Sequence, residues 1–383
     1  MLFLVITHTA IRNGKSSAGP YSTVIKALES ITHDIEAIKI PLQNFDYPIL
    51  FGKSSKAEEV TIPKELGAIP AIKYTVDIII IIYLIARYLY KHLDKVDQIV
   101  IIGIDPLSTL PAILFKYALG IKLIFYSVDF NEKRFLNEVL QKIYELADRL
   151  SSTAANQVWV VCNSLKEYKL HHYNTESTYI PNSFTFDGTN FRTNVKKRTL
   201  RRFVWTGSIL TNRQIKHIVD LCNKIQQLQP KAEFWFIPSN KLAEIKQEIK
   251  MTHLKNTKVL DVDGQQASRE LVSQCDIGIA VYDKRFGSTK YIEPIKIWEY
   301  MLCGLPFIIS CEPSLNKELI DEGVVYLLKP DNQVPKDTAA LEKFISPESV
   351  IAKRETCLEF AKKYDANKTI RHALSKLISS NTN

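Results

Sequence analysis

Short apolar runs alternate with longer amphipathic stretches along most of the chain. The runs are rich in β-branched and aromatic residues and lie at residues 2–7, 98–104, 122–127, 157–162 and 179–182. The stretches between them have helical spacing of apolar residues, most clearly at residues 21–31, 107–119 and 135–151. Continuously apolar strands separated by helices predict a parallel sheet that is covered by helices on both faces.

The alternation stops at residues 183–200, which are polar and basic, and it restarts at residue 202. We interpret the interruption as a linker between two domains. Strands are predicted beyond it at residues 202–206, 232–237, 257–260, 277–281, 306–310 and 324–328, and helices at 212–228, 241–250, 268–274, 294–303 and 347–378. The pattern predicts an α/β protein with two doubly wound Rossmann-like domains. We expect them at residues 1–185 and 186–362, with a terminal helix at 363–383 that crosses back to the first domain.

The most apolar segment, residues 76–90, reads VDIIIIIYLIARYLY. Its uncharged core at 78–86 is about nine residues long, whereas a membrane-spanning helix needs about 20. Asp77 and Arg87 bracket this core, so we exclude a transmembrane helix. Two interpretations remain, namely a buried helix of the domain and an interfacial helix with its apolar side in lipid.

Length and composition fit this picture. At roughly 150 residues per domain, 383 residues suggest two domains. The 46% apolar and 24% charged residues exclude a disordered, collagen-like or polytopic membrane protein. The six cysteines show no metal-binding spacing and are typical of reduced, buried thiols in a cytoplasmic protein. The N-terminus has no basic region and indicates a first strand rather than a signal peptide.

The net charge of +9 favours an anionic partner, such as nucleic acid, phosphate groups or a membrane surface. Residues 188–219 contain no Asp or Glu and carry eight of the positive charges, namely Arg192, Lys196, Lys197, Arg198, Arg201, Arg202, Arg213 and Lys216. One interpretation is a solvated linker. The other is that residues 192–202 face anionic lipid headgroups together with the apolar segment at 78–86. No nucleic-acid recognition motif is present, so we exclude nucleic acid.

The most informative stretch is residues 291–310, YIEPIKIWEYMLCGLPFIIS. Pro294 fits the start of a helix, and Gly304 fits its left-handed cap. Lys296 lies at the positive end of this helix, where backbone N–H groups, the helix dipole and one ammonium favour a diphosphate. Glu299 lies one turn further and can accept hydrogen bonds from ribose hydroxyls. The alternative is a surface Lys–Glu pair on an amphipathic helix.

The sequence PIKIWEYMLCGLPFII resembles the nucleotide-sugar motif of GT-B glycosyltransferases, especially bacterial enzymes similar to glycosyltransferase family 4 (group 1). Weaker similarities follow in the family's order at residues 147–148, 158–164, 180–182, 205–208 and 275–279. The resemblance implies two domains that face a cleft. The N-terminal domain would bind the acceptor and the C-terminal domain the nucleotide-sugar.

The resemblance also implies roles for single residues. Lys296 would bind the donor diphosphate and Glu299 the ribose. Arg213 lies six residues after Gly207, where the family often has a phosphate-binding Lys. Ser208 stands where the family often has Arg, so one positive charge fewer would contact the donor phosphates.

The chain departs from the family directly before the helix. Tyr291 occupies the position at which many members have a second Glu, and Glu293 is out of register with it. Both remain candidate donor-binding residues, as do Pro294 and Ile295. The departure weakens any assignment of a retaining mechanism.

In the N-terminal domain, residues 14–21 form a Gly-containing loop that matches neither a Walker A motif nor G-x-G-x-x-G. We expect Gly19 to let this loop approach the donor phosphates, although a plain strand–helix connection is the alternative. Asp129 follows the strand at 122–127 and is the catalytic candidate, since transfer needs a group that accepts or orients the hydroxyl proton. Its alternative roles are a helix cap or a partner of Lys133 or Arg134.

Other polar residues receive structural interpretations. A turn or cap suits Asp105 because Pro106 follows it, and we expect His8, His171 and His172 to be structural or surface residues. The D-x-D sequence at 261–263 is interpreted as a loop. We therefore expect no metal and no cofactor.

The function that follows is transfer of a sugar from a UDP- or GDP-sugar to an acceptor hydroxyl in cell-surface polysaccharide or glycolipid synthesis. The expected partners are the nucleotide-sugar and a glycan or lipid-linked acceptor. The expected location is the cytoplasm, and peripheral association with the inner face of the plasma membrane is a further option. A nucleotide-sugar 2-epimerase and a non-catalytic GT-B subunit are the alternatives.

Overall fold

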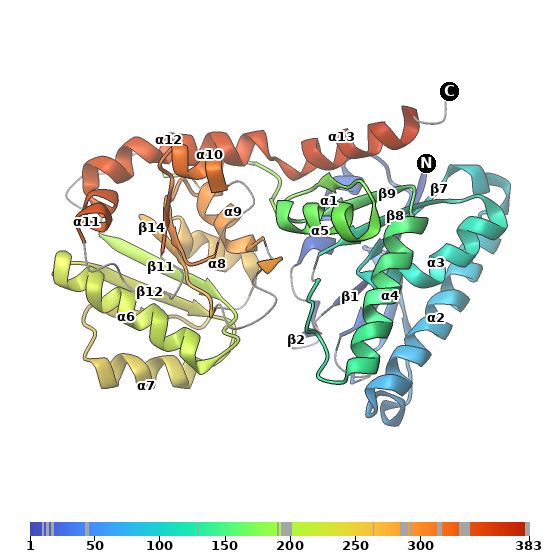
Figure 1. Ribbon diagram of the computed structural model, residues 1–383, viewed down its shortest axis with the longest axis horizontal. Helices are drawn as coiled ribbons and strands as arrows, with labels where there is room; N and C mark the ends of the chain where they lie inside the picture. The colour runs from blue at the N-terminus through green and yellow to red at the C-terminus, as the bar shows by residue number, and fades with distance from the viewer. Residues whose placement is uncertain are drawn as a thin grey trace. The chain divides into compact units, whose positions relative to one another are not determined.

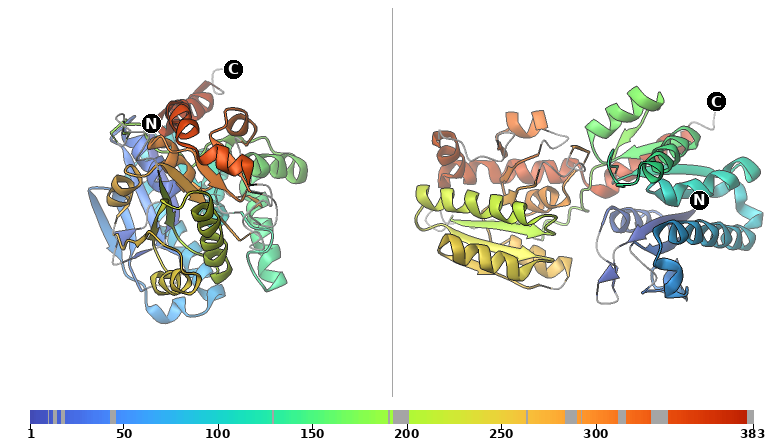
Figure 2. Two further views of the ribbon diagram at one scale, coloured as in Figure 1. Left: turned by 90° about the vertical axis from the view of Figure 1, so that its left-hand side faces the viewer. Right: turned by 60° about the horizontal axis from the view of Figure 1, so that its bottom comes forward.

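A computed structural model describes residues 1–9, 11–12, 15–16, 19–42, 46–128, 130–189, 191–192, 201–262, 264–283, 290–291, 293–311, 316–328 and 338–379. The chain divides into two compact units. The first comprises Met1–Asn182 and Ala366–Asn383, and the second Ser183–Asp365. Each division lies a few residues from the boundary expected from the sequence. In each unit, helices cover both faces of a sheet (Figures 1 and 2).

The first unit contains an eight-stranded sheet in its described part, in the order β10-β9-β8-β7-β1-β4-β5-β6. The strands are β1 (Leu2–Thr9), β4 (Ile35–Pro41), β5 (Ile49–Lys53), β6 (Lys56–Val60), β7 (Ile99–Ile104), β8 (Lys122–Ser127), β9 (Gln157–Val160) and β10 (Thr178–Tyr179). The predicted parallel strands are present. Strand β4, which pairs parallel with β1, was not predicted. Strands β5 and β6, which continue the sheet at one edge and pair antiparallel, were not predicted either.

Strand β1 explains why the strands of this sheet are continuously apolar. Leu4 and Ile6 belong to the apolar cluster that contains Ile81 and Leu84 of helix α2. Val5 points to the opposite face, because side chains alternate along a strand, and it is also fully buried. The helices of this unit are α1 (Pro20–Glu29), α2 (Pro70–Lys91), α3 (Pro106–Leu119), α4 (Glu138–Ala154), α5 (Asn163–Tyr173) and α13 (Ala366–Ser379). Short elements are β2 (Ile11–Arg12), β3 (Lys15–Ser16) and the 3-10 turns η1 (Lys64–Gly67) and η2 (Leu93–Gln98).

The order in which successive strands are added to this sheet reverses between β1 and β7. Strand β4 follows β1 on one side, whereas β7, β8 and β9 extend the sheet on the other. The carboxyl ends of β1 and β7 are adjacent, with Thr7 paired to Ile104. In doubly wound sheets ligands bind outside the carboxyl ends of the strands at such a switch point.

The second unit is built on a six-stranded parallel sheet in its described part, in the order β13-β12-β11-β14-β15-β16. Its strands are β11 (Arg202–Gly207), β12 (Glu233–Pro238), β13 (Thr257–Val259), β14 (Ile277–Ala280), β15 (Phe307–Ile309) and β16 (Val325–Leu327). Its helices are α6 (Asn212–Leu228), α7 (Leu242–Thr252), α8 (Gln265–Val272), α9 (Ile295–Leu302), α10 (Asn316–Asp321), α11 (Ala339–Ile345) and α12 (Pro347–Lys363). The switch point of this sheet lies between β11 and β14.

The C-terminal region differs from the single helix predicted at 347–378. It forms two helices, α12 and α13, that are separated by Tyr364 and Asp365. The carboxylate of Asp365 accepts a hydrogen bond from the backbone N–H of Phe186 at 2.6 Å, which fixes the break. Helix α13 packs against α1 in the first unit, and Gln157 of β9 donates to the carbonyl of Ala373.

The apolar segment at 76–90 lies within α2, as a helix buried on one side. Ile81, Leu84 and Ile85 are fully buried, whereas Ile79 and Tyr83 remain about 60% exposed. Among the described residues, no helix is long and apolar enough to cross a membrane. The exposed side of α2 is compatible with the second interpretation of this segment, an interfacial helix.

Candidate active site

Helix α9 is held at the carboxyl edge of the second sheet by close packing. A Cβ atom on Gly278 of β14 would lie 2.2 Å from the ring of Tyr300, so only glycine allows this contact. The Tyr300 hydroxyl donates to the carbonyl of Ile279 at 2.9 Å. Gly304 has φ +67 and ends the helix as predicted, with Leu305 N–H bonded to the Tyr300 carbonyl. These contacts fix the first turn of α9 beside the ends of β14 and β11.

Lys296, in this first turn, has a buried ammonium group. Its Nζ atom has no hydrogen-bond partner among the described residues, and it lies 4.5 Å from the ring centre of Trp205 and 5.0 Å from that of Tyr282. Burial lowers the pKa of Lys296 to about 7, although Cys311 and Glu299 favour its charged form. A buried cation without a hydrogen-bonding partner is costly, which makes this position suited to an anionic ligand.

Glu299 lies one turn further along α9 and is also buried. Its Oε1 atom is 3.8 Å from Nε of Arg269 in α8, which is too long for a hydrogen bond. Burial raises the pKa of Glu299 to about 7, whereas Arg269 and Lys296 favour its charged form. The surface Lys–Glu pair considered from the sequence is therefore wrong, since both groups are buried. The contact of Arg269 with Glu299 was not predicted from the sequence. The only signal for it was a positive charge in the helix that precedes the motif.

The structure brings Gly207 next to Lys296. Gly207 ends β11 with φ +104, and a Cβ atom there would lie 3.5 Å from the Lys296 ammonium. Ser208 is exposed, and its hydroxyl lies 2.8 Å from that of Ser239. Arg213, in the first turn of α6, donates from Nε to His217 at 3.2 Å. Gly207 forms the carboxyl end of β11, and Ser208 and Ser239 directly follow the carboxyl ends of β11 and β12.

The residues directly before α9 are mostly enclosed. Tyr291 is 2% exposed and Glu293 is 3% exposed. Pro294 occupies the N-cap and offers no side-chain acceptor to the first turn, which begins at Ile295. The backbone N–H groups of the first turn are thus not capped by the preceding side chain.

Two predicted residues belong to the first unit. Gly19 is the N-cap of α1 in an extended conformation, and its N–H group lies 3.3 Å from the Ser22 hydroxyl. Asp129, the catalytic candidate, lies outside the described residues, between β8 and Phe130.

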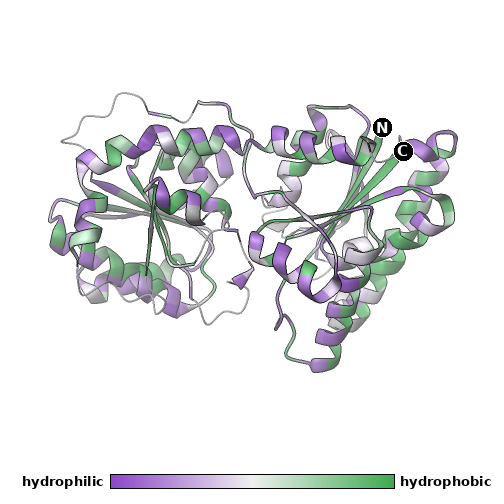
Figure 3. Cartoon of the chain, turned by 45° about the horizontal axis from the view of Figure 1, so that its top comes forward, coloured by the Kyte–Doolittle hydropathy of each residue, from purple (hydrophilic) through white to green (hydrophobic). Residues whose placement is uncertain are grey.

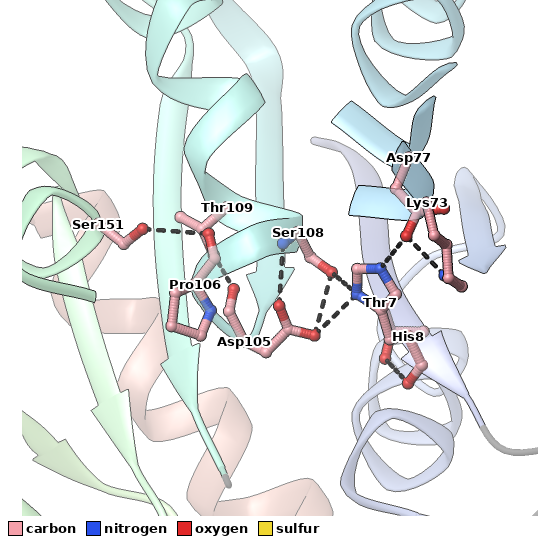
Figure 4. A network of polar contacts seen from close by, with 9 residues as sticks. All are labelled: Thr7, His8, Lys73, Asp77, Asp105, Pro106, Ser108, Thr109 and Ser151. Carbon is pink, nitrogen blue, oxygen red and sulfur yellow. Dashed lines mark hydrogen bonds and ion pairs between the residues drawn. The ribbon is translucent and has the colours of Figure 1, made fainter. Parts of the chain in front are cut away.

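The first unit contains a polar cluster that the sequence did not predict (Figure 4). His8, near the end of β1, has a buried side chain, and its Nδ1 lies 3.0 Å from Oδ2 of Asp105 and its Nε2 3.3 Å from Oδ2 of Asp77. Lys73 pairs with the same Asp77 oxygen at 2.6 Å. Burial alone would lower the pKa of His8, but Asp105 and Asp77 outweigh it and raise that pKa to about 9.

Asp105 has the cap role that was predicted and a further one. Its Oδ1 accepts the N–H of Ser108 at 2.9 Å, as an N-cap of α3 does. Its Oδ2 binds His8. The pair of His8 and Asp105 could have been predicted from their positions at the ends of two strands, because β1 and β7 are neighbours in the sheet. His171 and His172 are exposed, as expected.

The D-x-D sequence begins just after β13. Asp261 is exposed, and Asp263 lies outside the described residues. Within the described ranges, no three His, Cys, Asp or Glu side chains are grouped to hold a metal ion.

The basic segment is more neutral than its sequence suggests. Arg192 pairs with Asp276 at 2.7 Å, and Arg201 and Arg202 both pair with Glu233. Arg202 begins β11, whereas Gly207 ends it, so this end of the segment lies at the opposite edge of the sheet from Lys296. Residues 193–200 lie outside the described part.

Residues 201–346 match the family model described as Glycosyl transferases group 1. This region includes Gly207, Arg213, Lys296 and Glu299. A search among curated protein sequences gives no match.

Solved structures of similar fold extend over nearly the whole chain. A sucrose-phosphate synthase from Thermosynechococcus elongatus has a TM-score of 0.68 at 13% identity, covering 99% of each chain. HepE from Anabaena, in complex with UDP, has a TM-score of 0.65 at 16% identity, covering 99% of this chain and 100% of its own. A putative UDP-N-acetylglucosamine 2-epimerase from Listeria monocytogenes has a TM-score of 0.60 at 12% identity, covering 99% of this chain and 97% of its own.

These structures share the fold of two doubly wound units, and the family match identifies the domain type of the second unit. The second unit of this chain thus carries a group 1 glycosyltransferase domain, and the chain as a whole has the GT-B fold.

Proposed function

We propose that the enzyme transfers a sugar from a UDP-sugar to an acceptor hydroxyl, in the synthesis of a cell-surface polysaccharide or glycolipid. The buried ammonium of Lys296 carries the proposal, because it lies beside Gly207 at the start of α9, where the N-cap residue Pro294 supplies no side-chain acceptor. A diphosphate there would receive backbone N–H groups, the helix dipole and one cation. Glu299 would accept hydrogen bonds from the ribose hydroxyls. That HepE was solved with UDP favours uridine over guanosine.

We also propose that transfer needs no metal and no cofactor. Positive charge at the leaving diphosphate is the main requirement, and Lys296, Arg213 and the start of α9 supply it. Asp129 remains the proposed catalytic residue, and Gly19, Ser208, Tyr291, Glu293, Pro294 and Ile295 remain proposed donor-binding residues.

Calorimetry with UDP in buffer containing EDTA tests the donor site. We expect wild-type protein to bind UDP, and Lys296→Met to bind about 10- to 100-fold more weakly, since a hydrogen bond to a charged group contributes about 1.5–3 kcal/mol. Methionine removes the buried charge at similar volume, so the fold should persist. Lys250→Met, at an exposed position of α7, is the matched control and should bind like wild type.

Unchanged binding by Lys296→Met would contradict the assignment. Absence of UDP and GDP binding by the wild type would favour a non-catalytic GT-B subunit. The structural likeness to a putative 2-epimerase makes that activity the second candidate. Conversion of UDP-N-acetylglucosamine to its epimer without an acceptor would identify it.

A membrane surface is a further proposed partner. Helix α4 exposes an apolar stripe with helical spacing, formed by Val139, Ile143, Leu146 and Leu150, and the exposed Leu136 directly precedes its N-cap. Its end borders an apolar groove of about 340 Å³ between α2, α3 and α4, lined by residues that include Ile78, Ile82, Leu114 and Tyr117. Figure 3 shows such apolar positions alternating with polar ones along the helices. Exposed apolar surface of this extent is typical of a contact site, and the chain's positive charge favours anionic lipid.

A further inference from the structure

The polar cluster around His8 lies where a doubly wound sheet binds ligands. His8 is the last residue but one of β1, and Asp105 directly follows β7, so the pair spans the switch point of the first sheet. Asp77 reaches the same imidazole from α2. Three elements far apart in sequence therefore direct charged groups to one strand edge, as Figure 4 shows.

The backbone of Asp105 is strained. Its φ of 78 and ψ of 162 lie in a region that is essentially restricted to glycine. Thr109 stabilises this backbone conformation, because its hydroxyl donates to the Asp105 carbonyl at 2.8 Å. Thr109 in turn fits only because residue 103 is glycine, since a Cβ atom there would lie 2.2 Å from the Thr109 hydroxyl oxygen. Strained residues that are fixed by their surroundings cluster at functional sites.

A small cavity adjoins this pair. It measures about 10 Å³ and is lined by His8, Leu42, Tyr74, Asp105, Leu107, Arg134 and Tyr144. That is about the space of one water molecule, and therefore of one hydroxyl group. The lining combines a carboxylate with cationic and phenolic groups, which is suited to a polar group rather than to an apolar one.

We propose that Asp105 binds the hydroxyl group of the sugar acceptor in this cavity, and that His8 is a positioning residue for the Asp105 carboxylate. The proposal rests on the glycosyltransferase function proposed above. Asp105 accepts the hydrogen bond of the incoming hydroxyl and orients its oxygen. His8, bonded to both carboxylates, keeps Asp105 ionised and fixed.

The charges that face His8 agree with this division of roles. Lys73 and Asp77 approach from α2, Asp105 from the start of α3, and Arg134 from the segment before α4. Both ring nitrogens of His8 lie against carboxylates, so both carry hydrogens and neither is a free base. His8 and Ser108 hold the pKa of Asp105 below its usual range although burial opposes them. Asp105 is therefore a hydrogen-bond acceptor for the hydroxyl.

A second buried ion pair of the same unit provides a structural comparison. Lys169 and Asp148 are fully buried and paired, with the Lys169 ammonium among the rings of Phe125, Phe130 and Tyr173. Neither residue lines the cavity beside His8. A variant of this pair disturbs buried charge in the first unit without touching the proposed hydroxyl site.

The test compares Asp105→Asn, His8→Gln and Asp148→Asn in the full chain. Asparagine at 105 retains the oxygen that caps α3, so the variant should fold. UDP release is measured from UDP-glucose, UDP-galactose and UDP-N-acetylglucosamine, with water and with alkyl glucosides and galactosides as acceptors. UDP binding is measured separately by calorimetry, because it reports on the donor site alone.

We expect Asp105→Asn to lower kcat by about 100-fold with the donor KM and UDP affinity within twofold of wild type. His8→Gln should lower kcat by about 10-fold. The wild-type kcat, measured at saturating donor, should fall above about pH 9, as His8 loses its proton, and this fall should be absent in His8→Gln. Asp148→Asn should lower the melting temperature but leave the pH profile of kcat unchanged.

The proposal is overturned if Asp105→Asn turns over within threefold of wild type, or if His8→Gln retains the fall above pH 9. Wild-type protein that binds UDP but releases none from any donor with any of these hydroxyls also overturns it. Loss of UDP binding by the wild type itself would instead contradict the proposed function.

Discussion

Lys296 and Glu299 illustrate how burial alters single residues. Their charges are opposite, and yet burial moves the pKa of each to about 7, from above for the ammonium and from below for the carboxyl. Neither charge is compensated by a close hydrogen bond among the described residues. The pair is therefore poised for a ligand that supplies the missing partners.

This leads to a prediction about pH. Lys296 is charged below about pH 7 in the free protein, so the affinity for the diphosphate should fall as the pH rises from 6 to 9. UDP-glucose is the suitable ligand for calorimetry, because its diphosphate does not titrate in this range. Lys296→Arg, which stays charged at every pH in this range, should bind with a much weaker pH dependence.

Glu299 also titrates near pH 7, and its ionisation would strengthen the ribose contact as the pH rises. Glu299→Gln removes this opposing effect and should make the fall in affinity steeper. An affinity that is constant from pH 6 to 9 in Glu299→Gln would contradict the role given to Lys296.

At the scale of elements, the position of α9 depends on one glycine. The ring of Tyr300 packs directly over Gly278, and this contact sets where the first turn of α9 lies relative to β11. The lysine, the glycine of β11 and the helix start come together only because α9 approaches β14 so closely.

Gly278→Ala should therefore displace α9. We expect a loss of about 1–3 kcal/mol in the free energy of unfolding, as is usual for overpacking, and weaker UDP binding. Denaturant unfolding and calorimetry measure the two effects.

Gly120→Ala is the matched control. Gly120 has φ +70 at the end of α3, with nothing within 4 Å of a Cβ atom. Alanine there should cost about 1–2 kcal/mol through strain and leave UDP affinity unchanged. Equal UDP affinity of Gly278→Ala and wild type would show that α9 placement does not control the donor site.

At the scale of the whole molecule, the net charge is +9, but the basic segment at 188–219 carries less unpaired positive charge than the sequence suggests. Three arginines of the 188–219 segment are paired with Asp276 and Glu233. The apolar stripe of α4 and the adjoining groove, by contrast, are exposed. Contact with lipid should therefore depend more on the stripe than on the linker.

Vesicles of phosphatidylcholine with phosphatidylglycerol test this expectation. Replacing Val139, Ile143 and Leu146 together by serine should weaken vesicle binding at least tenfold, because each buried apolar side chain contributes about 1.5–3 kcal/mol. These side chains are exposed, so stability should change little. The comparison variant, with Lys196, Lys197 and Arg198 neutralised, should lose less. Equal binding by the serine variant and the wild type would remove α4 from the membrane contact.

Much of this fold was predictable because its strands are apolar along their whole length. Helix α6 and strand β8 have the bounds that the sequence predicts, since both are framed by clear changes of pattern. The edge strand β6 was missed because it is exposed and polar, whereas β4 and β5 were missed although much of each is buried. Helices α12 and α13 were merged because the Asp365 contact that separates them is not local.

The donor motif was found from sequence for a similar reason. Lys296, Glu299 and Gly304 act through helical spacing and a helix end, which are local properties of the chain. Tertiary structure alone decided that both charged groups are buried, and that Arg269 of another helix faces Glu299. It also decided that His8 meets Asp77 and Asp105, because charges that are nearly 100 residues apart become neighbours only when strands pair. Sequence thus determined the elements and their order, whereas long-range packing determined the charge state and partners of the side chains.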